Sequence, residues 1–536
     1  MWEFRKHSYH QFVYIGSIMI SKSQSIKRWM PFLAEAWFHH KELAHCRRLL
    51  TRPASAQIIP PFTFYSSPIR HQPLHLARPS ANKVKLVGID ADGVLRGKLI
   101  SKNKFISCIK SNGLGWCSVI FGWDMHDRAY HPELSISNIQ NGYRDLVARI
   151  DLDTGRRIPW EDDIPLFLVD FFEISHSDTP LCVCPRGLLK TVLKRLEQEA
   201  GIGALAGIEY EYFQFKETAE SIKEKGFVDL TPLTVGMHGY SVLRPSLNQE
   251  YFHELFESAL GFGIAIEGHH TETGPGVYET ALAYTDALKM ADNAALFKLT
   301  AKNVGMKHGI IPSFMAKPHA NLPGCSGHVH ISLKSIASNT NLFAGPNLNP
   351  AWPDTSQISV QAEEFIAGLM TCLPDMIPCL IPTINGYKRL VEGFWAATNV
   401  SWGLDSRLAS VRVISPPSCT PEATRLEIRV PGADMNPHYA LSAILAAGYY
   451  GIHNHLSLRD MPPISLQTDN QPIYPLSPLP KTLMEATQNF MKPDSKARKI
   501  LGDQFVDHFG KTRENEWKLY CQAVTNWELE RYLELA

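Results

Sequence analysis

The pattern of apolar and polar positions predicts strands in the first regularly patterned part of the chain. Residues 84–90 form an apolar run, and Asp92-Gly93 is a turn signal before a second strand over residues 95–100. Short apolar segments separated by polar turns continue to about residue 170. A stretch rich in Ser, Asp, Thr and Pro at residues 175–185 then predicts a linker.

Beyond this linker the pattern predicts helices alternating with short strands. After Pro185, five Leu and Val side chains between residues 188 and 196 recur at helical spacing, which predicts an amphipathic helix. Ala-rich helices are predicted over residues 290–304 and 437–450, and a partly charged helical tail over residues 494–535.

Composition is that of an ordinary soluble protein with about two to four domains. The 53 Lys and Arg balance the 53 Asp and Glu, so no global field attracts nucleic acid or an anionic membrane. No apolar run approaches the roughly 20 residues that span a bilayer. The ten cysteines are scattered without paired zinc-ligand spacing, which favours free thiols in the cytoplasm.

Residues 1–78 differ from the rest, because they carry only three acidic residues among many Arg, Lys and His. A segment poor in acids and rich in Arg, Ser and Ala is typical of a transit peptide. The same composition also fits an irregular or disordered extension, or a wrongly assigned start site. We expect no chemistry from this region.

Two glutamates on one predicted strand form the first candidate site. In residues 207–215, Glu209 and Glu211 lie two positions apart and therefore point to the same side of the strand. Both faces of this strand are partly apolar, as in the interior of a sheet, where carboxylates are costly unless a cation or donors meet them. A metal site is the favoured interpretation, and a solvated rim of two acids is the alternative.

A predicted loop and a predicted strand add acids and imidazoles. The loop, residues 267–279, is broken by Gly274-Pro275-Gly276, so it can fold back and aim separate carboxylates at one point. On the strand, residues 324–333, an H-x-H pair alone is more often an ordinary surface feature. Carboxylates with an imidazole nevertheless suit Mg²⁺ or Mn²⁺ better than structural zinc. The side chains are Glu267, His269, His270, Glu272 and Glu279 in the loop and His328, His330 and Ser332 on the strand.

The last candidate set is basic and comprises Y-K-R-L at residues 387–390, Arg407, Arg412 and R-L-E-I-R at residues 425–429. Ion pairs on a sheet surface are one explanation, but Arg forks also suit polyphosphate and carboxylate recognition. Together with the acids, these residues fit phosphoryl transfer from ATP to an anionic acceptor. No GxxxxGK[ST] loop is present, so another scaffold would have to bind the nucleotide.

These segments, in this order, resemble the glutamine synthetase family, especially its divergent fungal members. The resemblance runs from about Val84 to the C-terminus. It implies an α+β fold, with an N-terminal β-grasp domain over residues 84–178 and a catalytic domain of antiparallel strands backed by helices over residues 179–536. It also implies a homo-oligomeric ring with active sites between subunits. The motifs are G-x-E-x-E (207–211), HHxE with PGxxE (269–279), G-H-x-H-x-S-L (327–333), Y-K-R-L (387–390) and R-x-E-x-R (425–429).

The resemblance further implies an ATP-dependent glutamate–ammonia or glutamate–amine ligase that forms γ-glutamyl phosphate. Two or more Mg²⁺ or Mn²⁺ ions per site are expected, with ATP as co-substrate. Each motif position then has an expected role. One metal would be held by Glu211, Glu272 and Glu279, and a second by Glu209, His328 and Glu427. ATP would be contacted by Glu267, His330, Ser332 and Arg425, and glutamate by Arg389 and Arg429. The expected catalytic residues are Glu272 and two that would contact the transferring phosphoryl group, Arg407 and Arg412.

The residues around the amine depart from the family pattern. After Y-K-R-L, ammonia-using members carry a Glu where this chain has Trp395, which we therefore expect in the substrate site. An indole cannot act as a base, but it can pack against a larger amine. In the N-terminal loop, only Asp124 could replace the family's Asp. Two hypotheses follow: a working ligase for ammonia or an organic amine, and a non-catalytic protein that binds nucleotide or glutamate for regulation or scaffolding.

Overall fold

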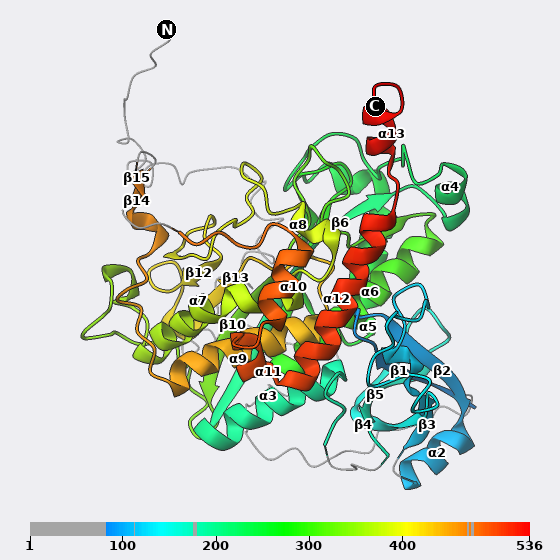
Figure 1. Ribbon diagram of the computed structural model, residues 1–536, viewed down its shortest axis with the longest axis horizontal. Coiled ribbons are helices and arrows are strands. Elements are labelled where there is room, and N and C mark those ends of the chain that lie inside the picture. Colours follow the sequence, from blue (N-terminus) through cyan, green and yellow to red (C-terminus); the bar gives the residue numbers. More distant parts are fainter. Residues whose placement is uncertain (1–81, 112, 175–178, 469–470, 473–475) are drawn as a thin grey trace, which may run out of the picture. The chain divides into compact units, whose positions relative to one another are not determined.

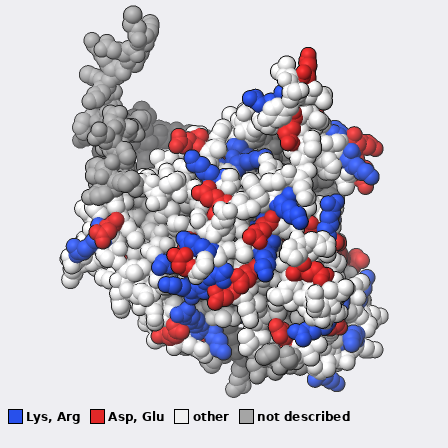
Figure 2. Space-filling model, in the orientation of Figure 1, with Lys and Arg blue, Asp and Glu red and all other residues white. Residues whose placement is uncertain are grey.

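The computed structural model describes residues 82–111, 113–174, 179–468, 471–472 and 476–536 (Figure 1). The predictions for residues 1–78 lie outside the described residues. The described elements form two large sheets with helices packed on them, so the expected α+β class is confirmed. No helix among the described residues is long and apolar enough to cross a membrane. On the face drawn in Figure 2, acidic and basic side chains are interspersed, in keeping with the balanced charge.

The first sheet is built from the apolar runs predicted as strands before residue 173. β1 and β2 form the predicted hairpin, whose turn is closed by N–H groups of Asp92 and Val94 donating to Asp90 Oδ1. β5 is buried along its whole length and lies parallel to β1, so it is the core strand. The order is β2-β1-β5-β4-β3, with β1 (Lys83–Ile89), β2 (Leu95–Ser101), β3 (Leu114–Cys117), β4 (Asp145–Ile158) and β5 (Ile164–Phe172).

The helix α2 (Lys102–Lys110) was not predicted. Phe105 and Cys108 are its buried residues, at helical spacing, but the helix spans only nine residues. Periodicity over so short a segment does not separate a helix from a strand. Ser101 begins the helix by accepting a bond from the N–H of Lys104, 3.2 Å away. The expectation of short strands alone in this region was therefore wrong.

The second sheet is mostly antiparallel and contains the central strand β6. Its order is β11-β12-β13-β10-β6-β8-β7, and β9 also pairs with β6. β6 is thus an interior strand, as the sequence predicts. The strands are β6 (Ile202–Phe215), β7 (Ile266–Thr271), β8 (Tyr278–Asp286), β9 (Ile311–Ser313), β10 (Gly327–Ser335), β11 (Trp402–Leu404), β12 (Val411–Ile414) and β13 (Arg425–Ile428); a separate pair is β14 (Gln467–Thr468) with β15 (Gln471–Pro472).

Long apolar helices form most of the remaining core, and the helices predicted at residues 185, 290–304, 437–450 and in the tail are confirmed. α7 and α9 approach so closely at Gly451 that a Cβ there would lie 1.9 Å from the carbonyl oxygen of Glu364, so only glycine fits at this position. The helices are α3 (Pro185–Ala200), α4 (Ala219–Glu224), α5 (Gln249–Gly261), α6 (Ala287–Lys307), α7 (Val360–Leu380), α8 (Ile384–Tyr387), α9 (Pro437–His453), α10 (Leu483–Met491), α11 (Lys496–Leu501), α12 (Asp503–Gln522) and α13 (Asn526–Tyr532), with 3₁₀ turns η2 (Ser118–Phe121), η3 (Arg244–Asn248), η4 (Pro353–Thr355), η5 (Pro421–Ala423) and η6 (Ile464–Leu466).

A buried ion cluster ties the first sheet to the helices. Arg186, at the start of α3, is only 1% exposed and donates to Asp170 on β5 at 2.5 Å. It also donates to Asp151 on β4 at 3.0 Å and to Asp292 on α6 at 2.8 Å. Buried charges persist only when paired in this way, so Arg186 fixes two strands and two helices relative to one another.

Candidate active site

The register of the second sheet brings the predicted site segments together. Glu209 on β6 lies opposite His328 on β10, and Glu211 lies opposite Glu279 on β8. On the other side of β10, His330 lies opposite Glu427 of β13. Paired residues on neighbouring strands have adjacent side chains. Four segments that are distant in sequence therefore meet on three adjacent strand pairs.

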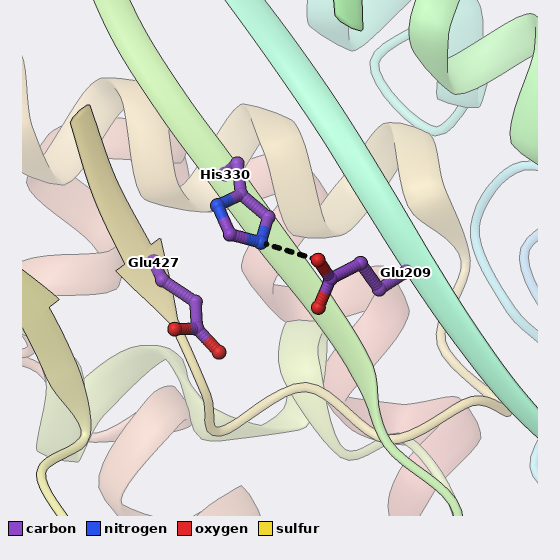
Figure 3. A group of neighbouring side chains, drawn as sticks. All are labelled: Glu209, His330 and Glu427. Carbon is purple, nitrogen blue, oxygen red and sulfur yellow. Dashed lines mark ion pairs between the residues drawn. The ribbon is translucent and has the colours of Figure 1, made fainter. Parts of the chain in front are cut away.

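The first cluster contains Glu209, His330 and Glu427, whose ligand atoms all lie within 4.8 Å of one another (Figure 3). His330 Nε2 is 3.1 Å from Glu209 Oε1. His328 Nδ1 faces the same two acids, 3.6 Å from Glu209 and 3.4 Å from Glu427. Both imidazoles are thus within reach of both carboxylates, and the predicted division of His328 to a metal and His330 to ATP stays a prediction.

Charge partners keep both acids of this cluster ionised. Although burial opposes it, His328, Arg429 and His330 lower the pKa of Glu427 to about 2. Burial also opposes ionisation of Glu209, but hydrogen bonds from His328 and His330 hold its pKa well below the ordinary range. The cluster therefore offers two carboxylates that are negatively charged at neutral pH.

The second cluster, His270, Glu272 and Glu279, lies on the hairpin of β7 and β8, again with ligand atoms within 4.8 Å of one another. Its loop folds back as the Gly-Pro-Gly segment predicts. Burial, followed by the charges of Glu211 and three other acids, raises the pKa of Glu279 to about 9. Acidic groups are thus in excess here, and among the described residues no Lys or Arg forms an ion pair with Glu279.

His270 belongs to the site, although no role was predicted for it. Successive residues of a strand point to opposite faces, so the side chains of His269 and His270 lie on opposite faces of β7. The ring of His269 stacks on that of Phe252, with 4.2 Å between centroids, and burial lowers its pKa to about 3, so it serves packing. His270 Nε2 lies 3.6 Å from Glu279 Oε1. The strand alternation was the signal that could have separated the two histidines.

The donor sets fit hard divalent cations. Each cluster combines two carboxylates with an imidazole, and Glu211 lies beside the second by register. Carboxylate oxygens are the preferred ligands of Mg²⁺ and Mn²⁺, and the raised pKa of Glu279 marks a place where positive charge is lacking.

A cavity of about 1040 Å³ begins at Glu209 and runs along β6, β8 and β10. Such a volume accommodates a ligand of nucleotide size. Arg425 Nε, at one wall, donates to His330 Nδ1 at 3.3 Å. All four residues predicted to contact ATP line this cavity, namely Glu267, His330, Ser332 and Arg425.

The other predicted arginines, Arg389, Arg407, Arg412 and Arg429, are not among the residues that line that cavity. Arg412 Nη1 donates to Glu427 at 2.9 Å, and Arg429 Nη1 donates to the same carboxylate. Arg389 is 4% exposed, donates to the backbone oxygen of Val430, and keeps a buried Nε without a partner among the described residues. Arg407 is exposed on the loop between β11 and β12.

Trp395 lies on the turn that follows α8. It is 69% exposed and has a φ of 60°, an unusual value for a bulky residue. Its neighbour Phe394 is held by Lys317, whose Nζ is 4.1 Å from the ring centroid. The indole therefore projects from an anchored turn and is free to contact another molecule.

Comparison with known proteins places the chain in a family. The model of the glutamine synthetase catalytic domain matches residues 182–532. The type-1 glutamine synthetase 2 of Dictyostelium discoideum is 44% identical over 452 residues, which cover 84% of each chain. The glutamate–isopropylamine ligase of a Pseudomonas species is 34% identical over 452 residues, covering 84% of this chain and 95% of the relative.

A solved chain of a GmaS/ADP complex has a TM-score of 0.69 and 25% identity, covering 84% of this chain and 97% of that one. The sequence match, the fold match and the motif positions agree. The chain belongs to the glutamine synthetase family of carbon–nitrogen ligases.

Proposed function

We propose that this protein is an ATP-dependent ligase that couples the side-chain carboxylate of glutamate to ammonia or a small primary amine. The observation that carries the proposal is that one acid cluster shares Glu209 and His330 with a nucleotide-sized cavity and shares Glu427 with the guanidinium groups of Arg412 and Arg429. This arrangement suits an anionic donor and an anionic acceptor that must approach each other.

In the proposed reaction, a γ-carboxylate oxygen of glutamate attacks the γ-phosphorus of ATP, and ADP leaves. The amine nitrogen then attacks the acyl carbon of γ-glutamyl phosphate, loses a proton, and inorganic phosphate leaves. Divalent cations, when bound by the two acid clusters, would supply positive charge to the phosphates. Arg389 and Arg429 would orient glutamate, and Arg407 and Arg412 would stabilise charge on the transferring group.

Trp395 favours an organic amine over ammonia. Its indole offers no formal charge to ammonium, whereas an exposed aromatic face contacts alkyl groups and organic cations well. The Pseudomonas relative is named for isopropylamine, which is an amine of this class. The acceptor proposed here is therefore a primary amine with a short apolar or hydroxylated substituent.

We also propose a homo-oligomer. Residues 227–247 expose Phe227 by 74%, Val242 by 93% and Leu243 by 73%, and such a concentration of apolar side chains is typical of a covered surface. The ring of Tyr240 in this segment packs at a tilt against that of His270 in the second acid cluster, with 4.8 Å between centroids. Light scattering of the purified protein measures the assembly directly; a monomer at micromolar concentration contradicts the proposal.

The test is phosphate release from Mg-ATP and glutamate with ammonia, hydroxylamine, ethanolamine, isopropylamine and a polyamine in turn. Glu209→Ala removes a carboxylate of the first cluster. The matched control is Glu254→Ala, which removes a carboxylate of α5 that is paired with His308. Release with one acceptor, lost only in Glu209→Ala, supports the ligase and identifies its amine. No release with any acceptor, despite ATP binding, contradicts it and favours the non-catalytic binding protein.

A further inference from the structure

Two short segments beside the site are bonded at three points. One, residues 380–389, contains α8 and ends at Arg389; the other, residues 430–434, follows β13. The N–H of Gly432 donates to the backbone oxygen of Leu380 at 3.2 Å. Arg389 Nη2 donates to the backbone oxygen of Val430.

The third bond joins two side chains at the opposite end of α8. Thr383 Oγ1 donates to Asp434 Oδ2 at 2.5 Å. The same hydroxyl accepts from the N–H of Gly386 at 3.2 Å, so Thr383 is the N-cap of α8. The carbonyl of Gly386 accepts from the N–H of Arg389 at 3.1 Å. A continuous line of hydrogen bonds thus runs from Asp434 to the backbone of Arg389.

This region has little freedom to adjust. A Cβ on Gly386 would lie 2.4 Å from Cγ2 of Ile381, and one on Gly324 would lie 2.7 Å from Cγ of Arg389. Since α8 has only four residues, its own hydrogen bonds cannot hold it in place, and the bond to Asp434 fixes where it begins. The buried, unpartnered Nε of Arg389 is therefore held at one place rather than free to seek an acceptor.

We propose that Asp434, acting through Thr383, is the positioning residue for Arg389 and thereby sets the affinity for glutamate. The proposal rests on the proposed function, in which Arg389 binds a glutamate carboxylate. Asp434 is 45 residues from Arg389 in sequence, and its charge also acts directly on the buried guanidinium, partly offsetting the lowering of the Arg389 pKa by burial. Thr383→Val leaves this charge in place, so it isolates the effect that passes through α8. A displacement of about 1 Å at such a donor is enough to weaken a charged hydrogen bond.

The test uses Thr383→Val, which keeps the shape but removes both the bond to Asp434 and the cap on the N–H of Gly386, and Thr383→Ser, which restores both. Asp434→Asn keeps an acceptor oxygen without the charge. Thr371→Val is the matched control, because Thr371 Oγ1 bonds only the helix carbonyl of Ala367, at 2.8 Å. Glutamate and ATP affinities are measured separately by calorimetry on the full chain with Mg²⁺, together with the melting temperature.

Thr383→Val is expected to weaken glutamate binding about tenfold, or about 1.4 kcal/mol. The affinity for ATP should change less than about twofold. Thr383→Ser should restore the wild-type affinity for glutamate, and Asp434→Asn should have a glutamate affinity between those of Thr383→Val and the wild type. Unchanged glutamate affinity in Thr383→Val, or equal loss of glutamate and ATP, overturns the proposal. Arg389→Gln separates the role of Arg389 from that of Asp434. If both Arg389→Gln and Thr383→Val bind glutamate normally, the proposed role of Arg389 fails. If Arg389→Gln loses glutamate binding and Thr383→Val does not, only the proposed role of Asp434 fails.

Discussion

Metal binding at the second acid cluster should release a proton from Glu279. Burial and the neighbouring acids raise the pKa of Glu279 to about 9, so its carboxyl is neutral in the metal-free protein at pH 7. A cation binds the ionised form, because a carboxylate is the ligand. At pH 8 about nine-tenths of these groups carry a proton, and each bound cation should displace about that fraction.

The same raised pKa of Glu279 determines how metal affinity and stability change with pH. Below about pH 9 the apparent affinity of this cluster for Mg²⁺ should rise about tenfold for each pH unit, and above it the affinity should level off. Conversely, a raised carboxyl pKa stabilises the metal-free fold most at low pH. This contribution is lost as the pH rises from about 4.5 towards 9, so the melting temperature of the metal-free protein should fall over this interval.

Calorimetry with MgCl₂ at pH 8, in two buffers of different ionisation enthalpy, counts the released protons. We expect about 0.9 proton per cation at this cluster for the wild type and less than about 0.2 for Glu279→Gln. Glu254→Gln, at the paired surface acid on α5, should behave as the wild type. An identical binding enthalpy in both buffers for the wild type would refute the assignment of a neutral carboxyl to Glu279.

Three further predictions concern the acceptor, the phosphoryl group and the fold. Trp395→Glu should raise the rate with ammonia relative to isopropylamine about tenfold, since it supplies a carboxylate for ammonium; an unchanged ratio in competition assays contradicts this role. Arg412→Ala should lower kcat at least about 100-fold with little change in the KM for ATP, measured by phosphate release, because its charge serves the transition state. Arg186→Met should destabilise the fold by about 3–5 kcal/mol in urea unfolding, whereas Arg195→Met, which removes an exposed pair with Glu199, should cost less than about 1 kcal/mol.

The sequence predicted those elements whose apolar pattern is long or regular. The helix after Pro185 and the strand carrying Glu209 are buried on defined faces, and burial is what the pattern records. α2 was missed because its nine residues are too few for helical periodicity to be recognised, whereas α3 has 16. Local pattern therefore located the site residues, while their pairing depended on strand register, which single-strand periodicity does not contain.

The contacts that support the site were beyond sequence reasoning. Thr383 and Asp434 lie 51 positions apart, and Arg186 and Asp292 lie 106 apart. None of these residues belongs to a motif, and each type is ordinary in its local segment. Their roles arise only when the chain folds and brings a buried donor to a buried acceptor, where leaving either group unpaired is costly.

The residues proposed for phosphoryl transfer and the residue proposed to select the amine stand on different kinds of structure. The amine preference can therefore change without a change in the phosphoryl-transfer residues. Most of the metal and nucleotide groups stand on β6, β7, β8, β10 and β13, so replacing one disturbs its partner across the ladder. Trp395 is 69% exposed on its turn, and the contact of Phe394 with Lys317 holds that turn in place. Substitution at Trp395 therefore breaks no buried contact, and selection for a new amine can act there while phosphoryl transfer is preserved.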